Sequence, residues 1–207
     1  MNQIIQVKDV DLRLLIDRFG IQLVEYNEFF REWQDDLPEI TDIEKQYLNK
    51  IKAGFVNLLN YPPLLENVVR MAVLHPLLFL ADLYLQPFYA RSEEGIDIIT
   101  EDQGTIIKGK INTLVLKDQF WIMVIESKRA SYSVEAGLAQ ILAYMLGNPN
   151  PEKPCYGMIT TGGNFVFIKL VRAGTPQYAL SNIFEVRNRG NALYDVMKIL
   201  KHICKLI

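Results

Sequence analysis

The chain has 207 residues, of which 50% are hydrophobic and 22% are charged, and its formal net charge is −2. This length and composition suit one globular domain with a sizeable core. A protein that holds nucleic acid mainly through phosphate contacts usually carries a basic bias, which this chain lacks overall. Any nucleic-acid binding must therefore use a local basic patch.

The composition also bears on the cellular compartment. The longest apolar stretch, Met71–Leu85, is interrupted by polar residues and falls short of a membrane span. No basic leader followed by an apolar segment and a cleavage site opens the chain. Cys155 and Cys204 lie far apart, without the spacing of a structural zinc site, so we expect reduced, buried thiols. We predict a cytoplasmic protein with no membrane contact.

Residues 1–60 are predicted to form a helical extension. A short helix is expected at Asp9–Phe19, followed by an irregular segment at Ile21–Glu39. Thr41 and Glu44 have the spacing of a capping box and open a second helix, which ends before Pro62. Helical spacing predicts that its apolar face carries Ile43, Tyr47, Ile51, Phe55, Leu58 and Leu59.

Residues 61–171 are predicted to form the core. A helix that follows Pro62 carries Glu66 in its first turn and is kinked or restarted at Pro76. Strand-like patterns separated by turn signals such as Glu94-Gly95 and Asp102-Gln103-Gly104 then follow, at Leu85–Ala90, Ile96–Thr100, Thr105–Lys110, Ile111–Leu116 and Phe120–Ser127.

A helix at Ser133–Leu146 and a hairpin of Tyr156–Thr160 and Phe165–Val171 complete this core. Residues 172–207 are expected to form a linker and a last amphipathic helix, Ala192–Cys204. This order of elements predicts a single α/β domain, in which helices flank a mixed sheet.

One stretch carries the candidate chemistry. The apolar run Trp121–Ile125 leads directly into Glu126-Ser127-Lys128-Arg129. In a strand, residues i and i+2 point to the same side, so Glu126 and Lys128 share a face. A carboxylate and an ammonium at the end of a buried strand are costly unless they are paired or hold a metal. The pattern therefore indicates either a strand-end ion pair or a site that combines a cation ligand with a phosphate contact.

The neighbouring motifs resemble the PD-(D/E)xK restriction-endonuclease-like superfamily, especially the nuclease segment of type I restriction R subunits and small stand-alone bacterial homologues. The resemblance covers residues 66–144 most closely. Its motifs are Glu66 on a helix, Gly109-Lys110-Ile111-Asn112 in place of Gly-x-x-Asp, Glu126-Ser127-Lys128, and Gln140-Ile141-Leu142-Ala143-Tyr144 in place of Gln-x-x-x-Tyr. It implies a restriction-endonuclease-like mixed sheet and metal-dependent hydrolysis of DNA.

This sequence departs from the family pattern at Asn112, where the pattern places its main metal-binding aspartate. An asparagine carbonyl can ligate Mg²⁺, but it brings no charge. Three interpretations stay open: a nuclease that no longer cuts, a weakened enzyme that uses the Asn112 oxygen, or a site completed by another acid such as Asp97 or Glu94.

The resemblance also implies roles for single residues. Mg²⁺ or Mn²⁺ would be held by Glu126, Asn112 and Glu66, with Lys128 acting on the water or the phosphate. Gln140 would steady Lys128 or a phosphate. Nucleic-acid contacts are expected from Lys110, Arg129 and Tyr144, and the local basic face could also include Lys108, Lys169 and Arg172.

The partners follow from these roles. DNA is the expected partner, and a protein of a restriction system is a second one. Homodimerisation is compatible with such chemistry because cutting both strands takes two sites, although no residue pattern predicts it. The alternative function is an inactive nuclease-fold module that binds DNA or a protein.

Overall fold

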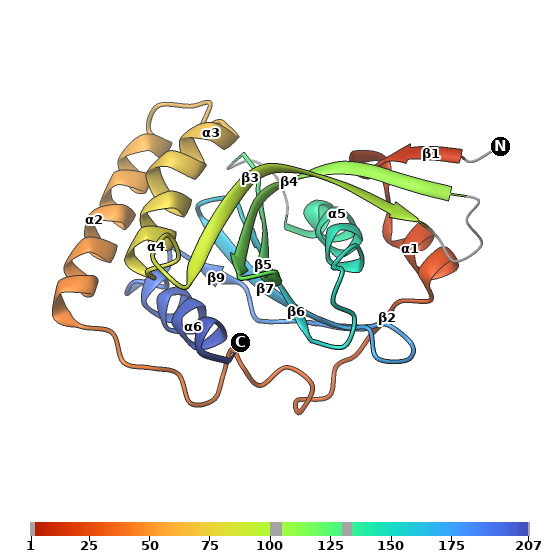
Figure 1. The fold of residues 1–207 in the computed structure, drawn as a ribbon. Coiled ribbons are helices and arrows are strands. Elements are labelled where there is room, and N and C mark those ends of the chain that lie inside the picture. Colours follow the sequence, from red (N-terminus) through yellow and green to blue (C-terminus); the bar gives the residue numbers. More distant parts are fainter. Residues whose placement is uncertain (1–2, 100–104, 130–133, 207) are drawn as a thin grey trace.

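A strongly curved mixed sheet runs through the molecule and carries helices on both faces (Figure 1). The computed structural model describes residues 3–99, 105–129 and 134–206. Within these residues nine strands form one sheet in the order β1-β4-β5-β6-β7-β8-β2, with β3 paired to β4 and β9 to β7. The strands are β1 (Gln3–Gln6), β2 (Gln22–Leu23), β3 (Phe88–Ile99), β4 (Thr105–Lys117), β5 (Phe120–Ser127), β6 (Cys155–Thr160), β7 (Asn164–Val171), β8 (Gln177–Leu180) and β9 (Phe184–Glu185).

Strand β4 joins β1 and β3 to the rest of the sheet. Its first residues pair in parallel with β1, its last residues pair antiparallel with β5, and β3 runs antiparallel along nearly its whole length. Strands β5 and β6 are parallel neighbours. The helix between them provides the crossover that parallel strands require.

The helices divide the interior into two apolar cores. They are α1 (Leu12–Phe19), α2 (Asp42–Leu59), α3 (Glu66–Val69), α4 (His75–Leu80), α5 (Val134–Leu146) and α6 (Leu193–Leu206), with a 3₁₀ turn at Val7–Asp9 and a π-helical turn at Arg70–Leu74. Helices α2, α3, α4 and α6 pack against one face of the sheet, whereas α1 and α5 pack against the other. The result is a three-layer α/β arrangement, which confirms the predicted mixed sheet flanked by helices.

Several local predictions are confirmed. The Thr41 side chain accepts a hydrogen bond from the Glu44 backbone, and the Glu44 carboxylate accepts one from the Thr41 backbone, so the capping box opens α2. Strands β6 and β7 form the predicted hairpin. Cys155 and Cys204 are free and buried, and burial raises the pKa of each thiol to about 12.

The strand boundaries were predicted less well. The four strands expected between Leu85 and Leu116 are two long strands, and the expected turn at Glu94-Gly95 lies inside β3. Because β3 and β4 pair over eleven positions, their ladder continues through residues that are typical of turns. The expected turn at Asp102-Gln103-Gly104 and the first residue of the expected helix, Ser133, lie outside the described residues.

The N-terminal region is not purely helical. Strands β1 and β2 join the sheet beside β4 and β8, and the region after residue 171 supplies β8 and β9. These strands are two to four residues long, so they carry too few alternating positions to be recognised by pattern.

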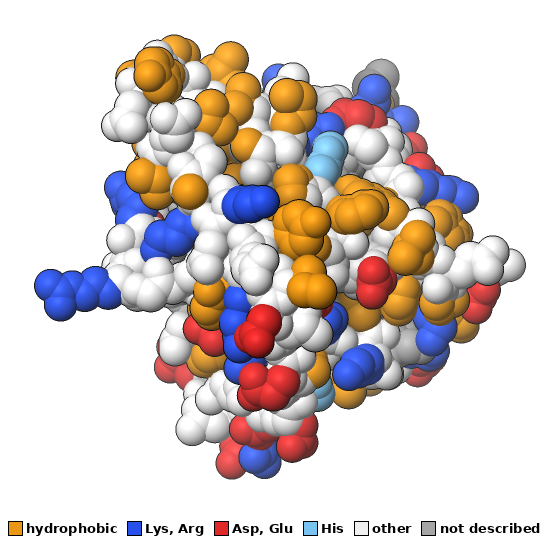
Figure 2. All heavy atoms as spheres, turned by 90° about the vertical axis from the view of Figure 1, so that its left-hand side faces the viewer, with side chains coloured by type: hydrophobic (Ala, Val, Ile, Leu, Met, Phe, Trp, Pro, Cys, Tyr) orange, Lys and Arg blue, Asp and Glu red, His pale blue; other side chains and the backbone are white. Residues whose placement is uncertain are grey.

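The apolar face of α2 is confirmed at Phe55 in the core and at Ile51, Leu58 and Leu59 packed against it, but it differs from the prediction in the first turns of the helix. Ile43 and Tyr47 are 67% and 52% exposed, whereas Leu48 and Phe55 are buried. Leu48 and Phe55 lie on one face of α2 and pack in the same buried cluster as residues of α4 and α6. This face of the helix is therefore the one turned toward the sheet. Apolar side chains therefore reach the surface on this side of the molecule (Figure 2).

The helix that follows Pro62 begins at Glu66 and passes through the π-helical turn before Pro76. Proline has no N–H to give to the preceding turn, which accounts for a widened turn at this place. No helix within the described ranges is both long and apolar enough to cross a membrane.

Gly109 on β4 allows three elements to meet. A Cβ atom added at this position would lie 2.5 Å from Val7 Cγ1 and 2.9 Å from Tyr144 Cε1. Such distances are far below van der Waals contact, so the residue must be glycine for Val7 and Tyr144 to approach the strand. The glycine of the Gly-x-x-Asn motif therefore seats the tyrosine of the Gln-x-x-x-Tyr motif.

Gly109→Ala is expected to destabilise the fold by about 1–3 kcal/mol because the added methyl group overpacks a filled site. Gly54→Ala is the matched control, since a Cβ atom at Gly54 meets nothing within 4 Å in the interior of α2. That substitution should stabilise the chain by about 0.5–1 kcal/mol. Urea unfolding of both variants measures the two effects, and an equal response would contradict the packing role of Gly109.

Candidate functional site

The Glu126 carboxylate and the Lys128 ammonium form an ion pair at the end of β5. Glu126 Oε1 lies 2.7 Å from Lys128 Nζ, and Glu126 is only 1% exposed. The second carboxylate oxygen, Oε2, is buried and has no hydrogen-bond partner among the described residues. A buried carboxylate oxygen without a partner is costly, so this atom is suited to a ligand.

Burial raises the pKa of Glu126 to about 7, and this desolvation outweighs the opposing effect of Lys128. The charges of Glu66 and Glu93 raise the pKa of Glu126 further. Three carboxylates from α3, β3 and β5 therefore lie near enough to interact electrostatically.

A chain of hydrogen bonds leads from Lys128 to the backbone of β4. Lys128 Nζ donates to Gln140 Oε1 at 2.7 Å, and Gln140 Nε2 donates to the Tyr144 hydroxyl at 3.0 Å. The Tyr144 hydroxyl donates to the Lys110 carbonyl at 2.7 Å. Gln140 and Tyr144 lie one turn apart on α5, which brings both side chains to the same strand end. Tyr144 is buried, so its hydroxyl holds the Gln140 side chain from the protein interior.

The charged pair borders a surface pocket of about 640 Å³. Its lining includes side chains of α3, β3, β4 and the segment after β5: Leu65, Glu66, Asn67, Arg70, Glu93, Asn112, Lys128 and Arg129. We call this the acid pocket. It brings together the predicted site residues Glu66, Asn112, Lys128 and Arg129, with Glu126 buried next to Lys128.

Arg70 lies between two of the acids. Its Nη1 atom is 3.6 Å from Glu66 and 3.4 Å from Glu93, and its side chain is 16% exposed. The guanidinium therefore neutralises part of the acidic charge in this pocket. Sequence reasoning missed Arg70, although its place four residues after Glu66 on a helix is a recognisable ion-pair spacing.

Glu93 is the other residue that sequence reasoning missed. Strand pairing joins Ser92 to Thr113 and Glu94 to Ile111, so Glu93 stands opposite Asn112. Its backbone has a φ of 56°, which is uncommon for a residue other than glycine. The sequence does not predict this conformation at Glu93. The neighbouring Glu94-Gly95 predicts a turn, which does not form.

Asp97 and Glu94, the acids named in the third interpretation of Asn112, face elsewhere. Asp97 pairs with Lys108 at 3.1 Å, and Glu94 pairs with Arg91 at 3.1 Å. Neither Asp97 nor Glu94 lines the acid pocket. Glu93 does, from the strand on which the compensating acid was expected.

Asn112 joins the ends of β4 and β5. Its Oδ1 atom accepts hydrogen bonds from the Ser127 backbone N–H at 3.0 Å and from the Ser127 hydroxyl at 3.1 Å. Both lone pairs of this oxygen are therefore used within the protein. A cation would have to displace at least one of these hydrogen bonds to bind Asn112.

The basic residues do not form one face. Arg129 lines the acid pocket, whereas Lys108 and Lys110 line a second pocket on the other side of Gln140. Lys169 is held by Glu32 and by the Phe29 carbonyl, and Arg172 donates to the Asn148 carbonyl. The expected extension of the basic face to Lys169 and Arg172 is therefore wrong, because internal acceptors bind both side chains.

Within residues 3–99, 105–129 and 134–206, no group of three His, Cys, Asp or Glu side chains is close enough to hold a metal ion. A comparison with models of protein families found no match, and a search of curated proteins found none either.

The raised pKa of Glu126 predicts a pH dependence of stability. The folded chain holds a proton on Glu126 up to about pH 7, whereas the ordinary value is 4.5. Because the native state binds more protons in this window, stability falls as the pH rises from 4.5 to about 7. The stability of Glu126→Gln minus that of the wild type should therefore rise across this window, by up to about 1.4 kcal/mol per pH unit, whatever its value at pH 4.5.

Urea midpoints across this pH range measure the effect. Glu185→Gln serves as the control, because the hydrogen bond from Arg187 lowers the pKa of Glu185, so its difference from the wild type should stay constant between pH 4.5 and 7. The stabilisation from Glu185 is present above the ordinary value and is lost as the pH falls. A difference between Glu126→Gln and the wild type that stays constant with pH would contradict the raised pKa.

Proposed function

We propose that this chain is a metal-dependent DNA endonuclease of the PD-(D/E)xK type, with the cytoplasm as its place of action. The observation that carries the proposal is the buried Glu126–Lys128 pair, which has an unpartnered carboxylate oxygen and borders a pocket with two further acids. The order of elements supports a restriction-endonuclease-like fold. A helix that carries Glu66 is followed by the antiparallel strands β3, β4 and β5, then by α5, and then by β6, which is parallel to β5.

The residues of the acid pocket fit a hard divalent cation. Mg²⁺ is commonly bound through one or two carboxylates, with waters and substrate phosphates completing its shell. Glu126 Oε2 is a buried oxygen without a partner, and the charges of Glu66 and Glu93 reach it. Two carboxylates are enough for such a site, so the absence of a close group of three acids among the described residues does not conflict with it. When bound, the ion would polarise the phosphate and lower the pKa of a water molecule.

The side chains of the pocket divide the remaining work. Glu126 and Glu66 would hold the ion, with Glu93 supplying charge opposite Asn112. Lys128 would donate to the phosphate or the attacking water, and Gln140 fixes the direction of the ammonium by accepting a hydrogen bond from it. Arg129 would contact a phosphate at the edge of the pocket.

The charge balance of the pocket favours a second candidate function. Glu66, Glu93 and Glu126 are matched in number by Arg70, Lys128 and Arg129, and both lone pairs of Asn112 Oδ1 are used. Such a pocket would suit a nuclease-fold module that binds DNA, or a restriction-system protein, without cutting. Unlike the proposed nuclease activity, this binding function would not depend on divalent ions.

Nicking of supercoiled plasmid tests the enzyme. We expect Mg²⁺ or Mn²⁺ to support nicking, chelation to stop it, and Glu126→Gln to reduce the rate at least a hundredfold, as for loss of a principal charge-stabilising group. Glu94→Gln is the matched control on β3, because Glu94 does not line the pocket. Equal activity in Glu126→Gln and the wild type would point to a contaminating nuclease. No nicking at all would favour the binding module.

Divalent-ion affinity tests the pocket separately from activity. Asn112→Asp adds a negative charge and Arg70→Gln removes a positive one, so each should tighten Mn²⁺ binding by on the order of tenfold. Arg91→Gln is the control, since it removes an arginine paired with Glu94 outside the pocket. Titration calorimetry measures all three. Unchanged Mn²⁺ affinity in both Asn112→Asp and Arg70→Gln would show that the ion does not bind in this pocket.

A further inference from the structure

A second pocket lies beside the acid pocket and has no role in the function proposed above. It has a volume of about 590 Å³ and is formed by the 3₁₀ turn, β3, β4 and α5. Its charged lining residues are Lys8, Lys108, Lys110 and Asp97, so its formal charge is +2 in a chain whose net charge is −2. We call this the lysine pocket.

Strand register sets the charge of the lysine pocket. Lys108 and Lys110 lie two residues apart on β4 and therefore share a face. Asp97 pairs with Lys108 across the strands, but the residue opposite Lys110 is Gly95. A Cβ atom at Gly95 would meet nothing within 4 Å, so the space beside Lys110 is open.

The position of Lys8 is also fixed by the fold. Gln6 pairs with Lys108, and Val7 packs on Gly109, which brings the following residue to the edge of the pocket. Among the described residues neither Lys8 nor Lys110 has an ion pair with a carboxylate. Two ammonium groups thus face an open pocket, and a strongly hydrated ammonium is suited to bind an anion as a point charge.

Gln140 and Tyr144 line the lysine pocket, and Gln140 accepts a hydrogen bond from Lys128, which lines the acid pocket. The hydrogen bond between Lys128 and Gln140 therefore joins a lining residue of one pocket to a lining residue of the other. A strand with one phosphate beside Lys128 that runs past Gln140 would bring a neighbouring phosphate to the lysine pocket.

We propose that the lysine pocket binds a backbone phosphate of a DNA strand next to the phosphate that lies in the acid pocket. This inference rests on the proposed function for the identity of the ligand. Lys8 and Lys110 supply the attraction, and Asp97 limits it by neutralising Lys108. The lysine pocket provides the local basic patch that the acidic chain requires to hold DNA.

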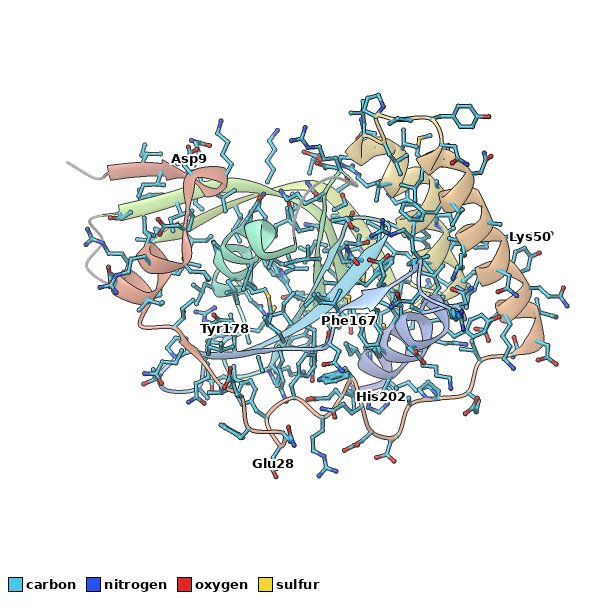
Figure 3. All side chains as sticks on the ribbon, turned by 180° about the vertical axis from the view of Figure 1, so that it is seen from behind. Asp9, Glu28, Lys50, Phe167, Tyr178 and His202 are labelled. Carbon is cyan, nitrogen blue, oxygen red and sulfur yellow. The ribbon has the colours of Figure 1, made fainter. Side chains whose placement is uncertain are left out.

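The test is fluorescence anisotropy with a labelled single-stranded oligodeoxynucleotide in EDTA, where no cutting can occur. Lys8→Gln/Lys110→Gln should weaken binding by on the order of tenfold at 0.1 M salt, and should lower the slope of log affinity against log salt by about 1.4. Lys50→Gln/Lys205→Gln is the matched control with the same change in charge. Lys50 lies on α2, at the opposite end of the molecule from Asp9 (Figure 3).

Asp97→Asn provides a gain that damage to the fold cannot produce. It releases Lys108 and raises the pocket charge to +3, so affinity should increase several-fold. Equal weakening by the two double variants, or unchanged affinity in Asp97→Asn, would overturn the proposal. Displacement of the strand by inorganic phosphate, but not by chloride of equal ionic strength, would overturn it in favour of a free phosphate ligand.

These outcomes are independent of the nicking assay. If binding depends on the lysines but no nicking occurs, the proposed role of the lysine pocket is supported and the proposed enzyme activity is wrong. If the protein nicks DNA but its binding does not depend on Lys8 and Lys110, the proposed enzyme activity is supported and the proposed lysine pocket is wrong.

Discussion

The buried ion pair between Glu126 and Lys128 is the interaction on which the site depends. Removing either partner would leave the other charge uncompensated in a desolvated place, and such losses are strongly destabilising. The pair alone does not satisfy Glu126, since burial keeps its pKa near 7 and one oxygen has no partner. Lys128 is held in turn by Gln140, which Tyr144 and the Lys110 carbonyl orient. The motifs on β4, β5 and α5 are thus one hydrogen-bonded unit, and Gly109 gives Tyr144 the room to complete it.

The parts of this site that sequence predicts well are those with a periodic or local signal. The apolar run before Glu126 identifies a buried strand, and i+2 alternation correctly places Glu126 beside Lys128. The helical spacing of Gln140 and Tyr144 places both on one side of α5. In each case the spacing along one element fixes the geometry, because neighbouring residues of a helix or strand have little freedom relative to one another. The capping box at Thr41 and the buried, unpaired cysteines are local in the same sense.

The parts that sequence misses depend on pairing between distant segments. Strand β1 is visible only through its register with β4, and Lys8 reaches the lysine pocket for the same reason. Glu93 enters the acid pocket through a left-handed backbone conformation that nothing in its neighbours indicates. The exposed positions of Ile43 and Tyr47 have a similar origin, since the direction in which α2 faces is set by the sheet and by α6. A one-dimensional pattern finds apolar residues but does not determine which of two adjacent stripes is buried.

Asn112 is best understood from its neighbours across the sheet. Register places Glu93 opposite Asn112 on one side, and continuing the β4–β5 ladder by one pair places Glu126 opposite it on the other. An aspartate here would have a like charge as its neighbour on both strands, which is destabilising unless a cation is present. Asparagine keeps the acceptor that Ser127 requires and avoids this repulsion. Asparagine therefore leaves no charge at this position for a bound ion to balance, and Arg70, between Glu66 and Glu93, balances part of the charge of those two acids. Both features stabilise the pocket without metal and weaken its attraction for one, so the affinity for divalent ions is the property that separates an enzyme from a binding module.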